Sequence, residues 1–403
     1  MIEPSFDGSH TQAMPTVTMR RELEIRFTGS GSEYFRIWIV NLLLTLVTLS
    51  LYYPWAKVRR LRYFYGNTAV GEHTLDFHGD PKRMLRGLLL VGALVGLYSV
   101  AGKVSPVAGL IAFVIVAAVW PALFRASQQF RLANTSWRGL RFRFNGNLPD
   151  AYRAMLPLFI PGAVTLAAVL FAADPAGALP GRGARTGGLL VPLAGLGSLL
   201  LFPLFLWLLK KYQHDHFALG QVQTELRTGA GSFYAIALKT LGVSLLAAFS
   251  AGVVAAVVSG GGALAVMFGS GRGRAGGIGA AIFALIVTLL IVYIAIILVV
   301  QPYVTSRLQN VVWNATRSRH VRFESALRFW PLLRLTLKNW LLIFVTLGLY
   351  GPFAKIATAR MRLESVTVHT LLPPDELVST LRERADDATG DAAGDLFGID
   401  IGW

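Results

Sequence analysis

Cysteine is absent from the 403 residues of this chain. Its absence excludes a disulfide framework, a Cys-ligated zinc or iron–sulfur centre and a thiol nucleophile. Acidic residues are also scarce, with 22 Asp and Glu against 38 Lys and Arg, and only 15% of the chain is charged. Hydrophobic residues make up 54% of the chain, and the mean hydropathy is +0.53. This composition excludes an ordinary soluble protein and predicts a polytopic membrane protein.

Eight apolar stretches are candidate membrane segments, and aromatic residues lie near most of their ends, as amphipathic rings do at the headgroup level. They cover roughly 34–53, 86–102, 105–124, 152–173, 187–209, 235–258, 276–301 and 335–353. The first twenty residues lack the short apolar core of a signal peptide, so we expect the first segment to be retained.

The connections between these stretches alternate in charge. Lys and Arg gather in 54–86, 125–154, 210–232 and 302–334, whereas the alternate connections hold few of them. Because translocation of Lys and Arg is disfavoured, we expect the basic connections to face the cytoplasm. This placement explains most of the net charge of +16, so we expect no specific nucleic-acid binding.

A module recurs in the basic connections. Its first two copies are Pro54, Asn67, Thr68, Phe77, Gly79 and Pro121, Asn134, Thr135, Phe144, Gly146. A weaker copy runs from Pro302 through Asn314 to Phe323, and a fourth, around Phe217, is only suggestive. Each clear copy predicts a helix end followed by a small β-hairpin at the inner face of the membrane. Strand-like pieces at 22–29 and 364–370 resemble the two halves of one more hairpin, whose pairing would close a quasi-cyclic layer.

The terminal apolar segments also repeat, since TLSLYYPWAKVRRLR at 48–62 matches TLGLYGPFAKIATAR at 346–360. If all eight segments span the membrane, the first and last must run in opposite directions, although both connect strands of the same kind. The conflict disappears if both are re-entrant helical hairpins that turn near TLSLYYP and TLGLYGP.

The fold class that we predict is therefore an all-α polytopic membrane protein with small cytoplasmic β-hairpins, six spanning helices and two terminal re-entrant hairpins. Eight spanning helices with both ends outside is the alternative. The predicted organisation is a disordered tail at 1–20, a membrane domain with internal repeats at 21–370 and an acidic disordered tail at 371–403, which holds eight Asp and Glu.

The stretch FTGSGSEYFRIWIVNLLLTLVTLSLYYPWAKVRRLRYFYGNT at 27–68, followed by FHGD at 77–80, resembles the opening of the YjgN family of bacterial inner-membrane proteins. The resemblance continues through the FRFNGN and HVRFES hairpins and fades in both tails. It implies a multi-pass protein of the inner membrane of a Gram-negative bacterium. It carries over no biochemical activity, catalytic residue or cofactor.

The sequence contains few residues that indicate catalysis, metal binding or proton transfer. No Asp or Glu lies inside any apolar stretch, which argues against a carboxylate proton relay and against an aspartyl intramembrane protease. His214 and His216 flank Asp215, but no third metal ligand is identifiable, and all seven histidines are expected in tails or solvated loops. We therefore expect no enzymatic activity, no catalytic residue, no cofactor and no metal site.

Two groups of residues are candidates for function. Asn41 and Asn339, which are equivalent in the terminal repeats, and the nearby Pro54 and Pro352 are candidates for helix contacts or for a substrate path. Eleven basic residues are expected to contact anionic lipid headgroups at the cytoplasmic face: Arg59, Arg60, Arg62, Lys82, Arg83, Arg138, Arg141, Arg143, Arg317, Arg319 and Arg322.

Two functions fit these features. Pro and Gly breaks at corresponding positions of repeats are typical of transporters, which favours a transporter without ion coupling or a channel-like protein. The alternative is a non-enzymatic membrane scaffold or partner subunit, whose basic cytoplasmic layer docks an unidentified protein. A water-filled cavity lined by Asn41 and Asn339 would favour transport, and a dry, sealed helix bundle would favour the scaffold.

Overall fold

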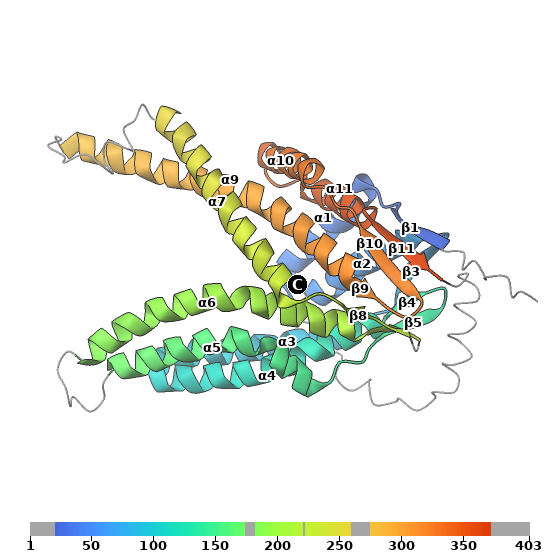
Figure 1. The fold of residues 1–403 in the computed structure, drawn as a ribbon, viewed down its shortest axis with the longest axis horizontal. Helices are drawn as coiled ribbons and strands as arrows, with labels where there is room; N and C mark the ends of the chain where they lie inside the picture. Colours follow the sequence, from blue (N-terminus) through green and yellow to red (C-terminus); the bar gives the residue numbers. More distant parts are fainter. Residues whose placement is uncertain (1–20, 174–181, 221, 259–274, 372–403) are drawn as a thin grey trace, which may run out of the picture.

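The computed structural model describes residues 21–173, 182–220, 222–258 and 275–371. The tails expected at 1–20 and beyond Leu371 lie outside these residues. The strands gather at one end of the molecule, and the helices extend away from them (Figure 1).

The described chain is built from five units, each a strand, two helices and a second strand. Unit 1 comprises β1 (Arg21–Phe27), α1 (Gly31–Val47), α2 (Tyr53–Gly66) and β2 (Thr68–Val70). Unit 2 comprises β3 (His73–Phe77), α3 (Pro81–Val104), α4 (Pro106–Ala133) and β4 (Thr135–Trp137). Unit 3 comprises β5 (Leu140–Phe144), α5 (Leu148–Ala173), α6 (Arg182–Asp215) and β6 (Phe217–Leu219).

Unit 4 begins with a divided strand, of which β7 (Val222–Gln223) is the first part and β8 (Glu225–Leu226) the second. It continues with α7 (Ala230–Val258), α9 (Ala275–Ala315) and β9 (Thr316–Arg317). Unit 5 comprises β10 (Val321–Ser325), α10 (Phe329–Val345), α11 (Gly351–Leu363) and β11 (Val366–Thr370).

One sheet of eleven strands joins the units, in the order β7-β6-β5-β4-β3-β2-β1-β11-β10-β9-β8. Within each unit, the strand before the helices pairs antiparallel with the strand after them. Between units, consecutive strands pair across short turns. The separate hairpins that the sequence predicts are therefore parts of one continuous sheet.

The two ends of the described chain meet in this sheet. Strand β1 pairs with β11 from Arg21 opposite Thr370 to Glu24 opposite Thr367, as the sequence predicts for the terminal strands. The two edge strands, β7 and β8, are separated in the chain only by Thr224. The sheet is therefore a ring that is interrupted at a single residue.

The helices follow the same ring. The two helices of each unit pack against each other, and each unit also contacts the next one, with α11 of unit 5 against α1 of unit 1. In units 1 and 5 the helix pairs are short and stay close to the sheet, whereas the helices of units 2, 3 and 4 reach much farther (Figure 1).

A phenylalanine and a glycine shape the end of the first strand in units 1, 2 and 3. The pairs are Phe27 with Gly29, Phe77 with Gly79, and Phe144 with Gly146. Each ring folds back over its glycine, so that a Cβ built on Gly146 would lie 2.4 Å from the Phe144 ring. A side chain at this position would need the ring to move, which explains why the sequence motif contains glycine.

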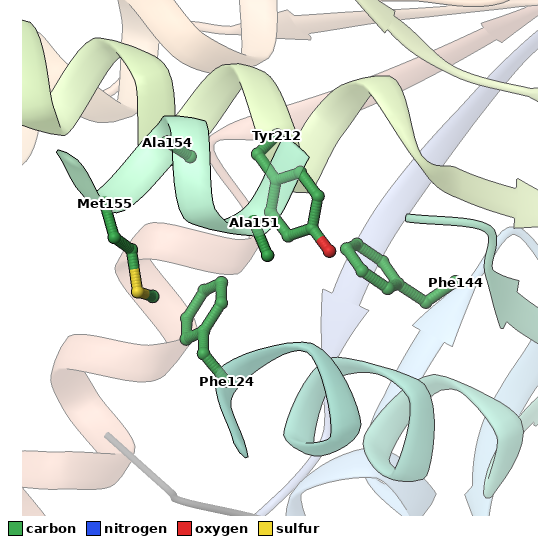
Figure 2. Packing of buried hydrophobic residues seen from close by; sticks show 6 residues of the cluster. All are labelled: Phe124, Phe144, Ala151, Ala154, Met155 and Tyr212. Atoms are coloured by element: carbon green, nitrogen blue, oxygen red, sulfur yellow. The ribbon is translucent and has the colours of Figure 1, made fainter. Parts of the chain in front are cut away.

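Figure 2 shows the cluster that fills the junction between units 2 and 3. Met155 of α5 points toward the Phe124 ring of α4, and the Phe124 ring packs against the Tyr212 ring of α6. That ring meets the Phe144 ring edge to face, with centroids 5.3 Å apart. The Tyr212 hydroxyl donates to the Asn147 carbonyl at 3.0 Å, so the buried ring keeps its polar end bonded. Similar clusters fill three other junctions, and the apolar core is thus divided among them.

A buried proline lies at the same spacing before the second strand of every unit: Pro54, Pro121, Pro203, Pro302 and Pro352. In units 1 and 5 this proline stands in the first turn of α2 and α11. In the other units it lies inside α4, α6 and α9. The repeats in the sequence indicate four of the five prolines but not Pro203, because the copy around Phe217 has Leu226 where the clear copies have phenylalanine.

The alignment of the weaker copy is wrong. In unit 1, Phe27 at the end of the first strand pairs with Thr68 at the start of the second. In unit 5, Ser325 holds the same position, because it pairs with Val366. Ser325, and not Phe323, is therefore equivalent to the phenylalanine of the clear copies. In the same way Thr316 corresponds to Thr68, so Asn314 stands one residue too early to match Asn67. Phe323 lies two residues before Ser325 on the same face of β10, so its phenylalanine resembles the one in the motif without holding the same position.

Tight turns join the helices of units 1 and 5, where the sequence predicts them. In unit 1, α1 ends at Val47, and Leu49 and Ser50 have φ angles of 48° and 71°. In unit 5 the equivalent Leu347 and Gly348 have φ angles of 49° and 95°. The Ser50 N–H donates back to the Thr45 carbonyl at 2.7 Å, which is the helix-ending arrangement that a left-handed residue permits.

Five helices of the described chain are long and apolar enough to cross a membrane: Pro81–Val104, Val107–Ala133, Leu190–Asp215, Ala230–Ala255 and Leu285–Ala315. At most 22% of the most apolar window of any of them is buried inside the protein. Such exposed apolar helices need lipid around them, so the chain is an integral membrane protein of mostly helical structure. The helix over 152–173 is not among the five.

Candidate functional site

The interior of the strand ring is filled with apolar side chains. Trp137 and Leu140 are buried there, and residues of other strands pack against them: Leu23, Val70, Leu75, Phe142, Leu219, Val222 and Val321. These residues come from strands all around the ring, from β1 to β10, so they meet inside it. The Trp137 indole N–H is buried with no hydrogen-bond partner. We name Trp137, Leu140 and these seven residues the apolar plug.

Three cations stand near the strand ends of their helices. Arg131 belongs to α4 of unit 2, Lys210 to α6 of unit 3 and Arg362 to α11 of unit 5, and the charge on Lys210 is disfavoured first by burial and then by repulsion from both arginines. Unit 5 is the neighbour of neither unit 2 nor unit 3 in the ring. Because the units are not all adjacent, their charges can act on each other only across the interior. We name Arg131, Lys210 and Arg362 the basic collar.

Neutral amides, rather than carboxylates, bind the basic collar. Arg131 donates to Gln128 at 3.0 Å, Lys210 to Gln213 at 3.0 Å and Arg362 to Gln309 at 2.9 Å. In the ranges that the structure describes, no carboxylate forms an ion pair with any of the three. Partial desolvation lowers the pKa of Arg362, whose side chain stays accessible, but a guanidinium remains charged at neutral pH. The interior therefore keeps an excess of positive charge.

Side chains of the second helices also tie the units together. In every junction one of them donates to a backbone carbonyl just before the next unit's first helix: Arg62 to Gly79, Arg125 to Gly146, Trp207 to Thr228, Asn310 to Leu327 and Arg360 to Gly29. The last of these bonds crosses from unit 5 to unit 1. The ring is thus held in the same way across the chain ends as elsewhere.

Asn41 and Asn339 lie inside the terminal hairpins. The Asn41 amide donates to the Ala56 carbonyl at 3.5 Å, and the Asn339 amide donates to Ala354 at 3.4 Å and to Thr358 at 3.3 Å. Both side chains are buried, and both side-chain oxygens lack a partner. Each asparagine thus bridges the two helices of its own hairpin, whose second helix has the buried Pro54 or Pro352 in its first turn.

The structure does not bring the eleven basic residues of the sequence analysis together. Arg59, Arg62, Lys82 and Arg83 are exposed on α2 and at the start of α3, close to the apolar helices. The others lie elsewhere: Arg60 is half-buried, Arg138 and Arg319 lie in strand turns, and Arg141, Arg143, Arg317 and Arg322 are exposed on strands. The strand turns are at the rim of the sheet opposite to the helix ends, about 16 Å away for a strand of five residues.

The expectation of a solvated loop at His214 is wrong. Helix α6 continues to Asp215, so His214 lies in its last turn and not in a loop. The imidazole is buried, lies 2.9 Å from the Thr316 hydroxyl and packs against the Trp313 ring. Its role is to join units 3 and 4. In the described ranges, no group of three or more His, Cys, Asp or Glu is arranged to hold a metal ion.

The ring and its repeats cover the same part of the chain as a known family. A family model with the description "Bacterial protein of unknown function (DUF898)" matches residues 22–396. The chain belongs to this family. The DUF898 match begins in β1 and extends past β11, so it includes all five units.

Relatives of this DUF898 chain carry one name. "Inner membrane protein YjgN" of Salmonella typhimurium is 31% identical over 146 residues, which are 36% of this chain and 37% of that protein. The protein of the same name from Escherichia coli K12 is 26% identical over 146 residues, with the same coverage. The resemblance to the YjgN family is confirmed, although the alignments span little more than a third of each relative. No solved structure matches the chain.

Proposed function

We propose that this protein is a channel-like or transport protein without ion coupling, and that its passage for anionic solutes follows the axis of the ring. The observation that carries the proposal is the basic collar. Like charges that share an interior repel each other, and a fold keeps them there only against a free-energy cost. An anion that enters the ring would remove this repulsion. Rings of cationic side chains select anions in pores for the same reason.

The proposed topology has six spanning helices, two re-entrant terminal hairpins and a cytoplasmic strand ring in the bacterial inner membrane. The direct pairing of β1 with β2 supports it, because a single crossing between these strands would put them on opposite sides of the membrane. The length of α1 also supports it, since 17 residues reach only about 26 Å. Buried residues in the ring interior and apolar exposed helices outside fit the same arrangement.

The apolar plug would then act as a gate. Hydrophobic constrictions block ions because water leaves them, and they conduct when they widen. No carboxylate lies in the apolar stretches, which supports a passage without proton or sodium coupling. We also propose that the protein has no enzymatic activity, since the partners of the basic collar in the described residues are neutral amides.

The experiment is an influx assay on the full-length protein in liposomes, with iodide as the permeating anion and an iodide-quenched dye inside. Replacement of Trp137 by Ala opens the plug, so we expect iodide entry at least ten times faster than in the wild type. Adding Arg131→Gln, Lys210→Gln and Arg362→Gln to this variant should bring the anion rate down to that of potassium. A well-folded Trp137→Ala protein that passes no iodide would overturn the proposal.

The scaffold is the second candidate, and the sealed plug favours it. The exposed faces of the strands carry alternating charges, such as Arg26 beside Glu24 and Arg322 beside Glu324, which suit docking of a soluble protein. Asn41 and Asn339 bond within their hairpins, as a structural role requires. The absence of iodide entry in both the wild type and the plug variant would favour this candidate.

A further inference from the structure

An open cleft of about 900 Å³ lies at the junction of units 4 and 5. Helix α9 forms one wall and the beginning of α10 the other. Nine residues line it, among them Arg307, Asn310, Leu327, Arg328, Trp330 and Arg334. Three of the nine are arginines, and none is acidic.

The three arginines have unused hydrogen-bonding capacity. Arg307, Arg328 and Arg334 are exposed, and within the described chain none of them forms an ion pair or a hydrogen bond with another side chain. The Arg307 guanidinium lies over the Tyr303 ring, 5.5 Å from the ring centroid. This contact holds the arginine side chain in place and leaves the guanidinium N–H groups available. Three guanidinium groups around one cleft match the oxygen atoms of a phosphate group.

The floor of the cleft is held in place by Asn310. Its amide donates to the Leu327 carbonyl at 3.0 Å, and its oxygen accepts from the Leu327 N–H and the Ser325 hydroxyl, each at 2.9 Å. Both ends of this side chain are therefore occupied. The walls are fixed to each other before any ligand binds, which lowers the entropic cost of binding.

The position of the cleft matches the headgroup level of the membrane. Trp330 stands at the edge of the cleft and is 66% exposed. Amphipathic indole rings prefer the headgroup level. Beyond the cleft α10 presents large apolar side chains to the outside, of which Leu341 is 63% and Phe344 is 80% exposed. A molecule with a phosphate in the cleft could therefore lay its acyl chains along α10.

The beginnings of the other hairpins differ in charge. Ser30, Asp80 and Asn147 accept hydrogen bonds from N–H groups in the first turns of α1, α3 and α5. At the same place before α10 stands Arg328, and no side chain caps the helix. The chain thus places positive charge here where equivalent junctions place a neutral or acidic cap.

We propose that this cleft binds the headgroup of an anionic phospholipid. Arg307, Arg328 and Arg334 contact the phosphate, and the acyl chains lie against the exposed apolar face of α10. A volume of about 900 Å³ is far larger than a free phosphate needs, and the cleft borders an apolar surface, which together favour a lipid over a soluble anion. The proposal is independent of transport through the ring.

Native mass spectrometry of the full-length protein in detergent tests the proposal, with phosphatidylglycerol as the anionic probe and phosphatidylethanolamine as the zwitterionic one. We expect one phosphatidylglycerol to be retained most tightly. The variant with Arg307→Gln, Arg328→Gln and Arg334→Gln should bind it at least ten times more weakly. A matched control, Arg141→Gln with Arg143→Gln and Arg322→Gln, removes the same charge from exposed strand positions and should bind as the wild type does.

The proposal is overturned if the cleft variant binds like the wild type, or if the control variant loses as much affinity, which would mean diffuse attraction by net charge. A competition experiment distinguishes a lipid headgroup from free inorganic phosphate as the ligand. Inorganic phosphate in millimolar excess should not displace the lipid, and displacement at equal concentrations would overturn the lipid as occupant. All six substituted side chains are exposed, and matching melting temperatures of the three proteins establish that they are folded.

Discussion

The short hairpins of units 1 and 5 and the long hairpins of units 2, 3 and 4 stand on the same base. In every unit the segment from the buried proline to the second strand is the same structure. In α2 and α11 this segment is almost the whole helix, whereas in α4, α6 and α9 it is the last part of a longer one.

Each long second helix thus corresponds to a short second helix with an apolar extension before the proline. A proline fits the first turn of a helix because its missing N–H is not needed there. Inside a longer helix it removes one backbone hydrogen bond and bends the axis. The base determines how units join, and the extension determines how far each one reaches from the sheet.

The largest expected effect concerns the depth of the two hairpin types. Because the chain has no cysteine, single cysteines can be labelled in intact cells with a membrane-impermeant maleimide. Lys103→Cys lies at the far end of a long hairpin and should label from outside. Ser50→Cys, at the tip of a short hairpin, should not. Ser318→Cys, in a strand turn, should label only after permeabilisation. Equal labelling of Ser50→Cys and Lys103→Cys would mean that unit 1 spans the membrane.

A second substitution separates the base from the extension. Gly146→Ala places a Cβ 2.4 Å from the Phe144 ring and 2.6 Å from the Tyr212 hydroxyl, so we expect a loss of about 1–3 kcal/mol of stability. Gly195→Ala lies in the extension of α6, where no atom beyond the neighbouring residues and turns of the helix is within 4 Å of the new Cβ, and should leave stability nearly unchanged. Thermal unfolding in detergent, followed by tryptophan fluorescence, measures both. Similar melting temperatures for the two variants would contradict the division.

The smallest expected effect distinguishes the two short hairpins from each other. Ser50 has a φ angle of 71°, where an L residue other than glycine is strained by roughly 1 kcal/mol, and the equivalent residue in unit 5 is Gly348. We expect Ser50→Gly to raise the melting temperature slightly and Gly348→Ser to lower it by a similar amount. Changes of the same sign in both variants would mean that the two turns are not equivalent.

Much of the fold could be predicted from the sequence, because the residues that carry it are local and repeated. Pro54, Thr68, Phe77 and Gly79 recur with fixed spacing, and the matching turns at 48–53 and 346–351 show that the chain reverses there. The copy around Phe217 was harder to recognise, since Leu226 and Thr228 replace the phenylalanine and the glycine. Ser325 was missed for a similar reason.

The candidate site could not be predicted in this way. Arg131, Lys210 and Arg362 have no common sequence motif and come from three different units. Only the ring brings them together, and which face of each helix turns inward depends on its neighbours on both sides. A signal did exist, because Arg131 and Arg362 stand at the same distance after Pro121 and Pro352, but reading it requires the closed arrangement of units.

The pairing of β1 with β11 has a consequence for how the protein is made. During synthesis β1 leaves the ribosome before the other strands that the structure describes, and its edge beside β11 stays open until all five units have been translated. Closure of the ring is therefore a late event, and an open strand edge in the meantime is a site for wrong pairing. In a circular permutant, the two ends of the chain are joined and the new ends lie at Thr224. Every pair of strands between units would then form between units that follow one another in the chain. Such a circular permutant should reach the membrane with less loss to aggregation.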